Sequence, residues 1–186
     1  SKIPSTRYNN SLSESIETFR PRSRQVIWET SSFYDQNIKN ILNAGNDVYL
    51  DGFWVSEKYF KDIRPVLSGD FGLKKKMSVP ASKLAKQISQ SNSVSIHIRR
   101  KDYVTNINTR RFHGIIDLNY YYKGIRKITK RVSSPCFFIF SDDINWTKDH
   151  LRIKYPVVFV DYFGSDAEEL TLMSFCKHNI IANSSF

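Results

Sequence analysis

The sequence predicts an α/β fold with a Rossmann-like, mostly parallel sheet in its C-terminal part. Two observations lead to this class. From about residue 81 to the end, short apolar, β-prone runs alternate with helical patterns, and polar residues follow directly after several of the apolar runs. The chain has 186 residues, of which 40% are hydrophobic and 14% aromatic, which is enough for a packed core.

The N-terminal part is less regular. Residues 1 to about 46 are polar and basic, with one helical pattern at 33–42. A short strand is expected at 48–54. A helix is expected at 56–64, capped by Ser56 and stopped by Pro65.

A linker-like stretch at 68–72 and a run of lysines lead to Pro80, so a domain boundary is expected near residue 80. Residues 1–80 then form the remnant of an N-terminal domain and a linker, and residues 81–186 form the Rossmann-like domain. Within the second part, strands are expected at 93–98, 135–140, 157–160 and 179–182, and helices at 81–88, 118–130, 144–152 and 167–177.

Polar side chains gather where these strands end. In a parallel sheet the carboxyl ends of the strands share one edge, which is where open α/β sheets bind ligands. The residues expected there are His97, Arg99, Arg100, Asp102, Asp142, Asp143, Asn183, Ser184 and Ser185.

Arg99 and Arg100 carry planar, permanently charged groups whose paired N–H donors match phosphate oxygens. The alternative is an exposed salt bridge with Asp102. Asp142 or Asp143 could accept hydrogen bonds from a nucleobase or a ribose. The alternative for one carboxylate of the pair is that Ser141 or Asp142 caps the next helix.

Three further residues could take part in chemistry. His113, expected on a loop near the arginines, is the most available proton acceptor. Glu169 is first a favourable charge at the start of a helix, and His178 is first a structural residue.

Several classes of site are disfavoured. No glycine-rich phosphate loop occurs, and no cluster has metal-ligand spacing, so side chains must bind any phosphate and a metal-independent mechanism is preferred. Cys136 and Cys176 are expected to be buried thiols without a disulfide. No apolar run is long enough to span a membrane, and no signal peptide is visible. The net charge of +10 favours anionic partners.

The stretch His-Ile-Arg-Arg-Lys-Asp-Tyr at 97–103 resembles the HxRRxDY motif of glycosyltransferase family 11, the α-1,2-fucosyltransferases. Further similar blocks follow in the family's order at 113–121, 138–143 and 172–186, with another upstream at 49–60. The resemblance covers about residue 48 to the end.

The resemblance implies a GT-B-like enzyme that transfers fucose from GDP-fucose to the 2-hydroxyl of a terminal galactose, with inversion and without a metal or other cofactor. It implies that Arg99 binds the β-phosphate with support from Arg100, that His97 and Asp142 contact guanine, and that Ser184 or Ser185 approaches the phosphates. His113 and Asp102 are both candidates for the base, and the resemblance does not choose between them.

The expected acceptor is a cell-surface glycan, with a lipid-linked form left open, in an enzyme that is cytoplasmic or peripheral at the inner face of the membrane. The family's N-terminal glycine-rich loop and C-terminal tryptophan-rich segment are not found, so an internal fragment is expected. Two alternatives stay open: another GDP-fucose-dependent fucosyltransferase, and a basic nucleic-acid-binding module.

Overall fold

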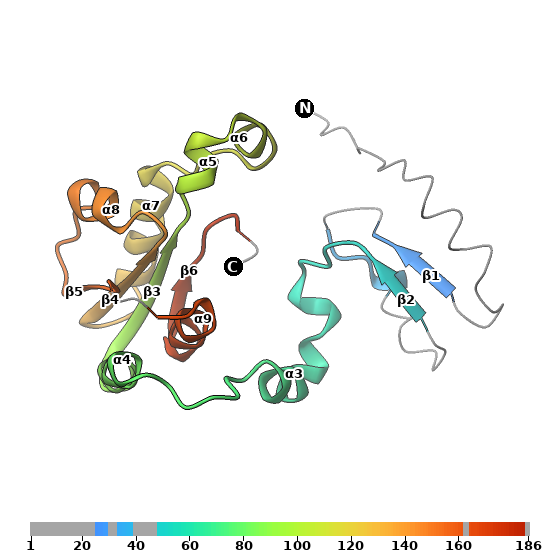
Figure 1. The fold of residues 1–186 in the computed structure, drawn as a ribbon, viewed down its shortest axis with the longest axis horizontal. Helices are drawn as coiled ribbons and strands as arrows, with labels where there is room; N and C mark the ends of the chain where they lie inside the picture. Colours follow the sequence, from blue (N-terminus) through green and yellow to red (C-terminus); the bar gives the residue numbers. More distant parts are fainter. Residues whose placement is uncertain (1–24, 30–32, 39–47, 162–163, 185–186) are drawn as a thin grey trace. The chain divides into compact units, whose positions relative to one another are not determined.

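The computed structural model describes residues 25–29, 33–38, 48–161 and 164–184 (Figure 1). The chain divides into two compact units, Ser1–Asp70 and Phe71–Phe186. The sequence places the boundary near residue 80, about ten residues later. Of the helix expected at 33–42, residues 36–38 are helical, residues 33–35 are not, and residues 39–42 lie outside the described residues.

In the first unit, strand β1 (Gln25–Trp28) pairs in parallel with β2 (Val48–Asp51). The prediction of a helix at 56–64 is wrong. Two short 3-10 turns, η1 (Glu57–Tyr59) and η2 (Lys61–Ile63), stand there, and Ser56 makes no side-chain cap.

Pro65 does not stop a helix but lies in the first turn of α3 (Arg64–Asp70), where its missing N–H would have had no helical partner. Three of the five residues expected as a linker at 68–72 therefore belong to this helix.

The second unit confirms the α/β class with a parallel sheet. Its four strands have the order β5-β4-β3-β6, and every pairing is parallel. The strands are β3 (Asn92–Ile98), β4 (Pro135–Ser141), β5 (Val157–Phe159) and β6 (His178–Ile180). The longer helices are α4 (Val79–Ser89), α7 (Leu118–Thr129), α8 (Ile144–His150) and α9 (Asp166–Phe175). All eight of these elements match the expected ones to within two residues at nearly every end.

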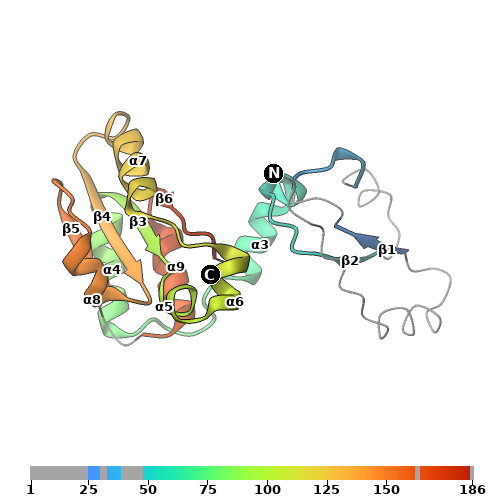
Figure 2. The same ribbon diagram turned by 90° about the horizontal axis from the view of Figure 1, so that it is seen from above.

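Helices cover both faces of this sheet (Figure 2). Side chains alternate along a strand, so Val94, Ile96 and Ile98 of β3 pack with α7 on one face. On the other face, Phe138 and Phe140 of β4 pack with α4 and α9. The central strands β3 and β4 are buried on both faces. Strand β4 accordingly has a nearly continuous apolar sequence, whereas β3 alternates apolar residues with the buried polar residues Ser93, Ser95 and His97.

Two short helices were not expected, α5 (Lys101–Thr105) and α6 (Ile107–His113). They follow β3 directly. Asn106 separates them and caps α6 through its side chain, which accepts from the N–H groups of Asn108 and Thr109. This pair of helices lies between β3 and α7 in the chain and contributes to the polar edge described next.

Candidate functional site

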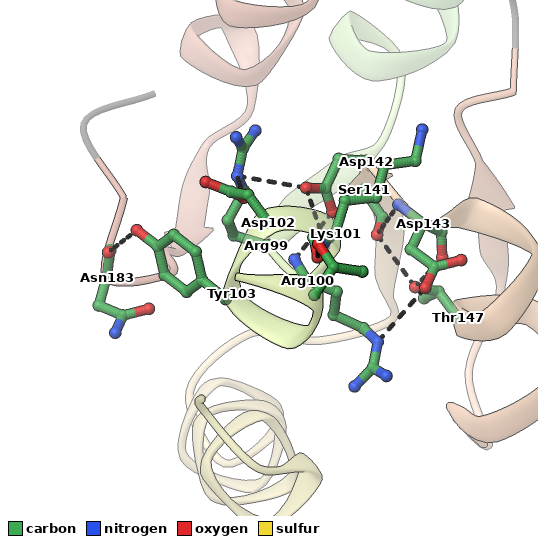
Figure 3. Close-up of polar contacts among 11 residues, drawn as sticks. Arg99, Arg100, Lys101, Asp102, Tyr103, Ser141, Asp142, Asp143, Thr147 and Asn183 are labelled. Atoms are coloured by element: carbon green, nitrogen blue, oxygen red, sulfur yellow. Dashed lines mark hydrogen bonds and ion pairs between the residues drawn. The ribbon is translucent and has the colours of Figure 1, made fainter. Parts of the chain in front are cut away.

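The predicted polar residues meet at the carboxyl edge of β3 and β4 (Figure 3). The two strands are in register, with His97 opposite Phe140 and Ile98 opposite Ser141. The chain segments that leave the two strands are therefore neighbours. The arginine segment and the Asp142-Asp143 pair are brought into direct contact.

Asp142 connects the two segments. Its Oδ1 accepts a hydrogen bond from the backbone N–H of Arg100 at 2.8 Å, and its Oδ2 accepts one from the N–H of Lys101 at 3.1 Å. Oδ2 also lies 3.2 Å from Nε of Arg99. A carboxylate has about four acceptor positions, and three of them are filled here. Asp142 thus positions the arginine segment, whereas its contact with guanine stays a prediction.

Arg99 is held from one side by carboxylates. Its Nε is 3.0 Å from Oδ1 of Asp102 and 3.2 Å from Asp142, and its side chain is 33% exposed. Figure 3 shows its two terminal nitrogens pointing away from both carboxylates. The salt bridge offered as the alternative to phosphate binding is present, yet it occupies Nε and leaves the terminal N–H donors directed elsewhere.

Arg100 leaves the chain on the opposite side from Arg99 (Figure 3). Its Nε lies 3.5 Å from Oδ2 of Asp143, and its guanidinium carbon stacks 3.3 Å from the ring centre of Trp146 on α8. The side chain is only 17% exposed. The two arginines therefore do not form one joint clamp: Arg99 is the more open group, and Arg100 is packed against Trp146.

The helix cap after β4 differs from both expected candidates. Asp143, not Ser141 or Asp142, caps α8 by accepting from the N–H of Trp146 at 3.4 Å. The hydroxyl of Ser141 accepts from the N–H of Asp143 and from the hydroxyl of Thr147, both at 3.1 Å. Asp143 thus fixes the start of α8 and, through Arg100, the arginine segment.

A second chain of contacts joins β6 to this edge. Tyr103 donates from its hydroxyl to the backbone oxygen of Asn183 at 2.8 Å, and the Asn183 side-chain amide donates to the backbone oxygen of His113 at 2.6 Å. The rings of Tyr103 and His113 are stacked, with centroids 5.0 Å apart. His113 is exposed and is the last residue of α6, so its expected place on a loop is wrong.

The remaining predicted residues differ in burial. His97 is only 4% exposed, and burial lowers its pKa, so the imidazole is neutral near pH 7. Ser184 is half-buried, while Ser185 lies outside the described residues. Glu169 opens α9 as expected, whereas its neighbour Glu168 is the buried one.

Three residues that contribute to the site or to the packing around it were not predicted from the sequence. Trp146 stacks on Arg100, as described above. Tyr121 of α7 is 1% exposed, its hydroxyl has no hydrogen-bond partner among the described residues, and burial with the nearby Tyr120 and Asp142 raises its pKa. Glu168 joins α9 to the start of α4 by accepting from the N–H of Ser78 at 2.5 Å and from its hydroxyl at 3.1 Å. A tryptophan three residues after the carboxylate pair was a usable signal for the first of these.

The structure adds three general findings. The described residues contain no group of three or more His, Cys, Asp or Glu side chains that could hold a metal ion. Cys136 and Cys176 are free thiols; Cys176 is buried, which raises its pKa to about 12, whereas Cys136 is only half-buried. No helix in the described part is long and apolar enough to cross a membrane.

Comparison with known proteins gives a consistent result. The family model described as glycosyl transferase family 11 matches residues 31–186. An α-1,2-colitosyltransferase of Escherichia coli is 39% identical over 161 residues, covering 84% of this chain and 54% of that protein. The O-antigen biosynthesis glycosyltransferase WbnK of Escherichia coli is 40% identical over 98 residues, covering 52% and 32%.

A mouse galactoside 2-alpha-L-fucosyltransferase, Sec1, is 26% identical over 176 residues, covering 88% of this chain and 47% of that protein. No solved structure gives a significant match. The chain thus spans about half the length, or less, of these relatives.

Proposed function

Because the chain belongs to glycosyl transferase family 11, we propose that it carries the donor-binding part of an inverting, metal-independent α-1,2-fucosyltransferase. The donor is GDP-fucose and the acceptor is the 2-hydroxyl of a terminal galactose in a cell-surface glycan. The observation that carries this proposal is Arg99, held through Nε by two carboxylates with its terminal donors directed away from them.

The geometry supports different tasks for the two arginines. As the bond from the sugar to the diphosphate breaks, negative charge grows on the leaving GDP, and fixed cations aimed at that charge stabilise the transition state. Arg99 supplies such a group. Arg100, held between Asp143 and Trp146, adds positive potential from a fixed position without needing to contact the phosphate.

The charged residues around the site balance one another. Arg99, Arg100 and Lys101 are balanced by Asp102, Asp142 and Asp143, so this cluster is neutral as a whole. Selective binding of a diphosphate must therefore depend on the direction of the guanidinium N–H groups more than on net charge. The bidentate geometry of a guanidinium supplies that direction.

Two residues are proposed for accepting the proton from the acceptor hydroxyl, Asp102 and His113. Asp102 is 44% exposed and bonded to Arg99, and His113 is exposed on α6 and stacked on Tyr103. Replacement of each in turn, with the transfer reaction followed, separates them: the base is the residue whose loss lowers kcat without weakening GDP-fucose binding.

A second donor sugar is favoured by a specific observation. The relative that is 39% identical over most of this chain is named as a colitosyltransferase, so transfer of colitose in place of fucose is the alternative. The acceptor would again be a surface glycan, lipid-linked during its assembly, with the enzyme in the cytoplasm or peripheral at the inner membrane face. A panel of the two donor sugars and several galactose-terminated acceptors decides among these substrates.

The first test is calorimetric titration of GDP-fucose, GDP and UDP into this chain and its Arg99→Ala variant, without divalent metal. Loss of a charge-assisted phosphate contact is expected to weaken GDP binding by about 10- to 100-fold. Lys86→Ala, which removes one exposed cation from α4, is the matched control and should bind as the parent does. Equal GDP binding by parent and Arg99→Ala, or equal affinity for GDP and UDP, would overturn the proposal.

A further inference from the structure

Five basic residues lie along helix α7 and the turn that follows it. Lys123, Arg126, Lys127, Lys130 and Arg131 are all exposed, and they follow one another at spacings of three, four, seven and eight residues from the first. Within the helix, spacings of three and four residues place Lys123, Arg126 and Lys127 on one face. Lys130 is the C-cap residue and Arg131 lies in the turn beyond it. We call this set the cationic stripe.

The stripe is not neutralised within the described part of the chain. None of its five side chains forms an ion pair there, and helix α7 contains no Asp or Glu. Like charges three or four residues apart repel and destabilise a helix. The helix dipole favours cations in the last turn, which accounts for part of the set but not for Lys123, which lies in the middle of the helix.

The surface around the stripe is hollowed and partly apolar. Lys123, Arg126, Lys127 and Lys130 line a groove of about 200 Å³. A second groove of about 420 Å³ runs between α7 and β6 and shares Lys123 and Lys127 with the first. Its other lining residues include Tyr120, Ile128, Ile180 and Ile181. Ile181 is 60% exposed and Tyr120 is 44% exposed.

We propose that the cationic stripe docks this protein onto a bilayer surface rich in anionic phospholipids. Clustered Lys and Arg attract acidic headgroups, and the exposed Ile181, with Tyr120 in the same groove, suits the boundary between headgroups and acyl chains. A nucleic acid fits less well, because the apolar part of this surface is mainly aliphatic whereas single strands use aromatic stacking. This docking surface extends the proposed function, since it would bring the enzyme to a lipid-linked acceptor.

The test uses flotation of the chain with phosphatidylcholine vesicles, with or without about a third phosphatidylglycerol. The variant Lys123→Gln/Arg126→Gln/Lys127→Gln should bind the anionic vesicles about 100-fold more weakly than the parent. The control Lys76→Gln/Lys83→Gln/Lys86→Gln removes the same charge from exposed sites before and on α4 and should bind as the parent does. Circular dichroism establishes that each variant is folded.

The parent should bind anionic vesicles and not pure phosphatidylcholine, and binding should weaken as salt is added. Equal losses in the two triple variants would show that only net charge matters and would overturn the proposal. Tight binding of an oligonucleotide, lost in the stripe variant, with no vesicle binding would overturn it in favour of a nucleic acid. GDP titration of the stripe variant keeps the two proposals apart, because the donor site should be unaffected whatever the vesicles show.

Discussion

Asp142 is the residue whose removal should most disturb the arginine edge. The variant Asp142→Ala deletes two hydrogen bonds from backbone N–H groups to a carboxylate that is 16% exposed, and one ion pair to Arg99. Hydrogen bonds to charged groups contribute about 1.5–3 kcal/mol each. Lys101 is exposed, so in the variant its N–H can donate to water instead. Only the loss of the hydrogen bond from the N–H of Arg100 therefore costs its full free energy.

The ion pair adds at most about 1 kcal/mol, since the Arg99 side chain is one-third exposed and screened by solvent. The expected loss in the free energy of unfolding is therefore about 2–4 kcal/mol. Asp142→Asn keeps one acceptor oxygen and should lose about half as much.

Urea unfolding followed by circular dichroism and tryptophan fluorescence measures these values. Trp146 is the only one of the three tryptophans that belongs to the second unit, and its ring contacts Arg100. The matched control is Asp143→Ala, which removes a helix cap at 3.4 Å and an ion pair at 3.5 Å and should lose about 1 kcal/mol. The reasoning is refuted if Asp142→Ala loses no more stability than Asp143→Ala.

Two further predictions concern buried groups outside the arginine cluster. Tyr121→Phe removes a buried hydroxyl that has no partner in the described part of the chain, so it should raise the free energy of unfolding by about 1 kcal/mol; a clear loss in urea unfolding would mean that the hydroxyl is bonded. The hydrogen bond from the Ser78 N–H lowers the pKa of Glu168. The Glu168 carboxylate thus stabilises the fold fully at pH values above its unfolded-state pKa of about 4.3. This stabilisation is lost as the pH falls through the lower folded-state pKa. Glu168→Gln should therefore be less stable than the parent at pH 7 and approach it at low pH, and parallel stability curves against pH would contradict this.

Most of the second unit could be predicted from the sequence because its signals are strong. Strand β4 is an almost unbroken apolar run, β3 alternates β-branched apolar residues with polar ones, and the helices between the strands have clear periodicity. The helix at 56–64 was misjudged because Pro65 can begin a helix as well as end one. The short helices α5 and α6 have too few turns for periodicity to reveal them.

The site could be located from the sequence but its internal contacts could not. The common edge of parallel strands brings Arg99 and Asp142 together, and this follows from topology alone. Which carboxylate caps α8 depends on backbone angles that neighbouring aspartates do not reveal, and Asp143 takes that place. The stacking of Trp146 on Arg100 depends on how α8 packs, which no local pattern encodes.

The two parts of the site follow strands at different positions in the described sheet, and they should differ in how readily they open locally. Arg99 and Asp142 follow β3 and β4, two seven-residue strands that pair with each other at the centre of the sheet. Asn183 and Ser184 follow β6, an edge strand paired over only three residues. Edge elements with few bonds open locally far more often than the centre of a sheet. We therefore expect the backbone of the arginine half of the site to exchange slowly, and the half contributed by β6 to open more often without unfolding of the domain.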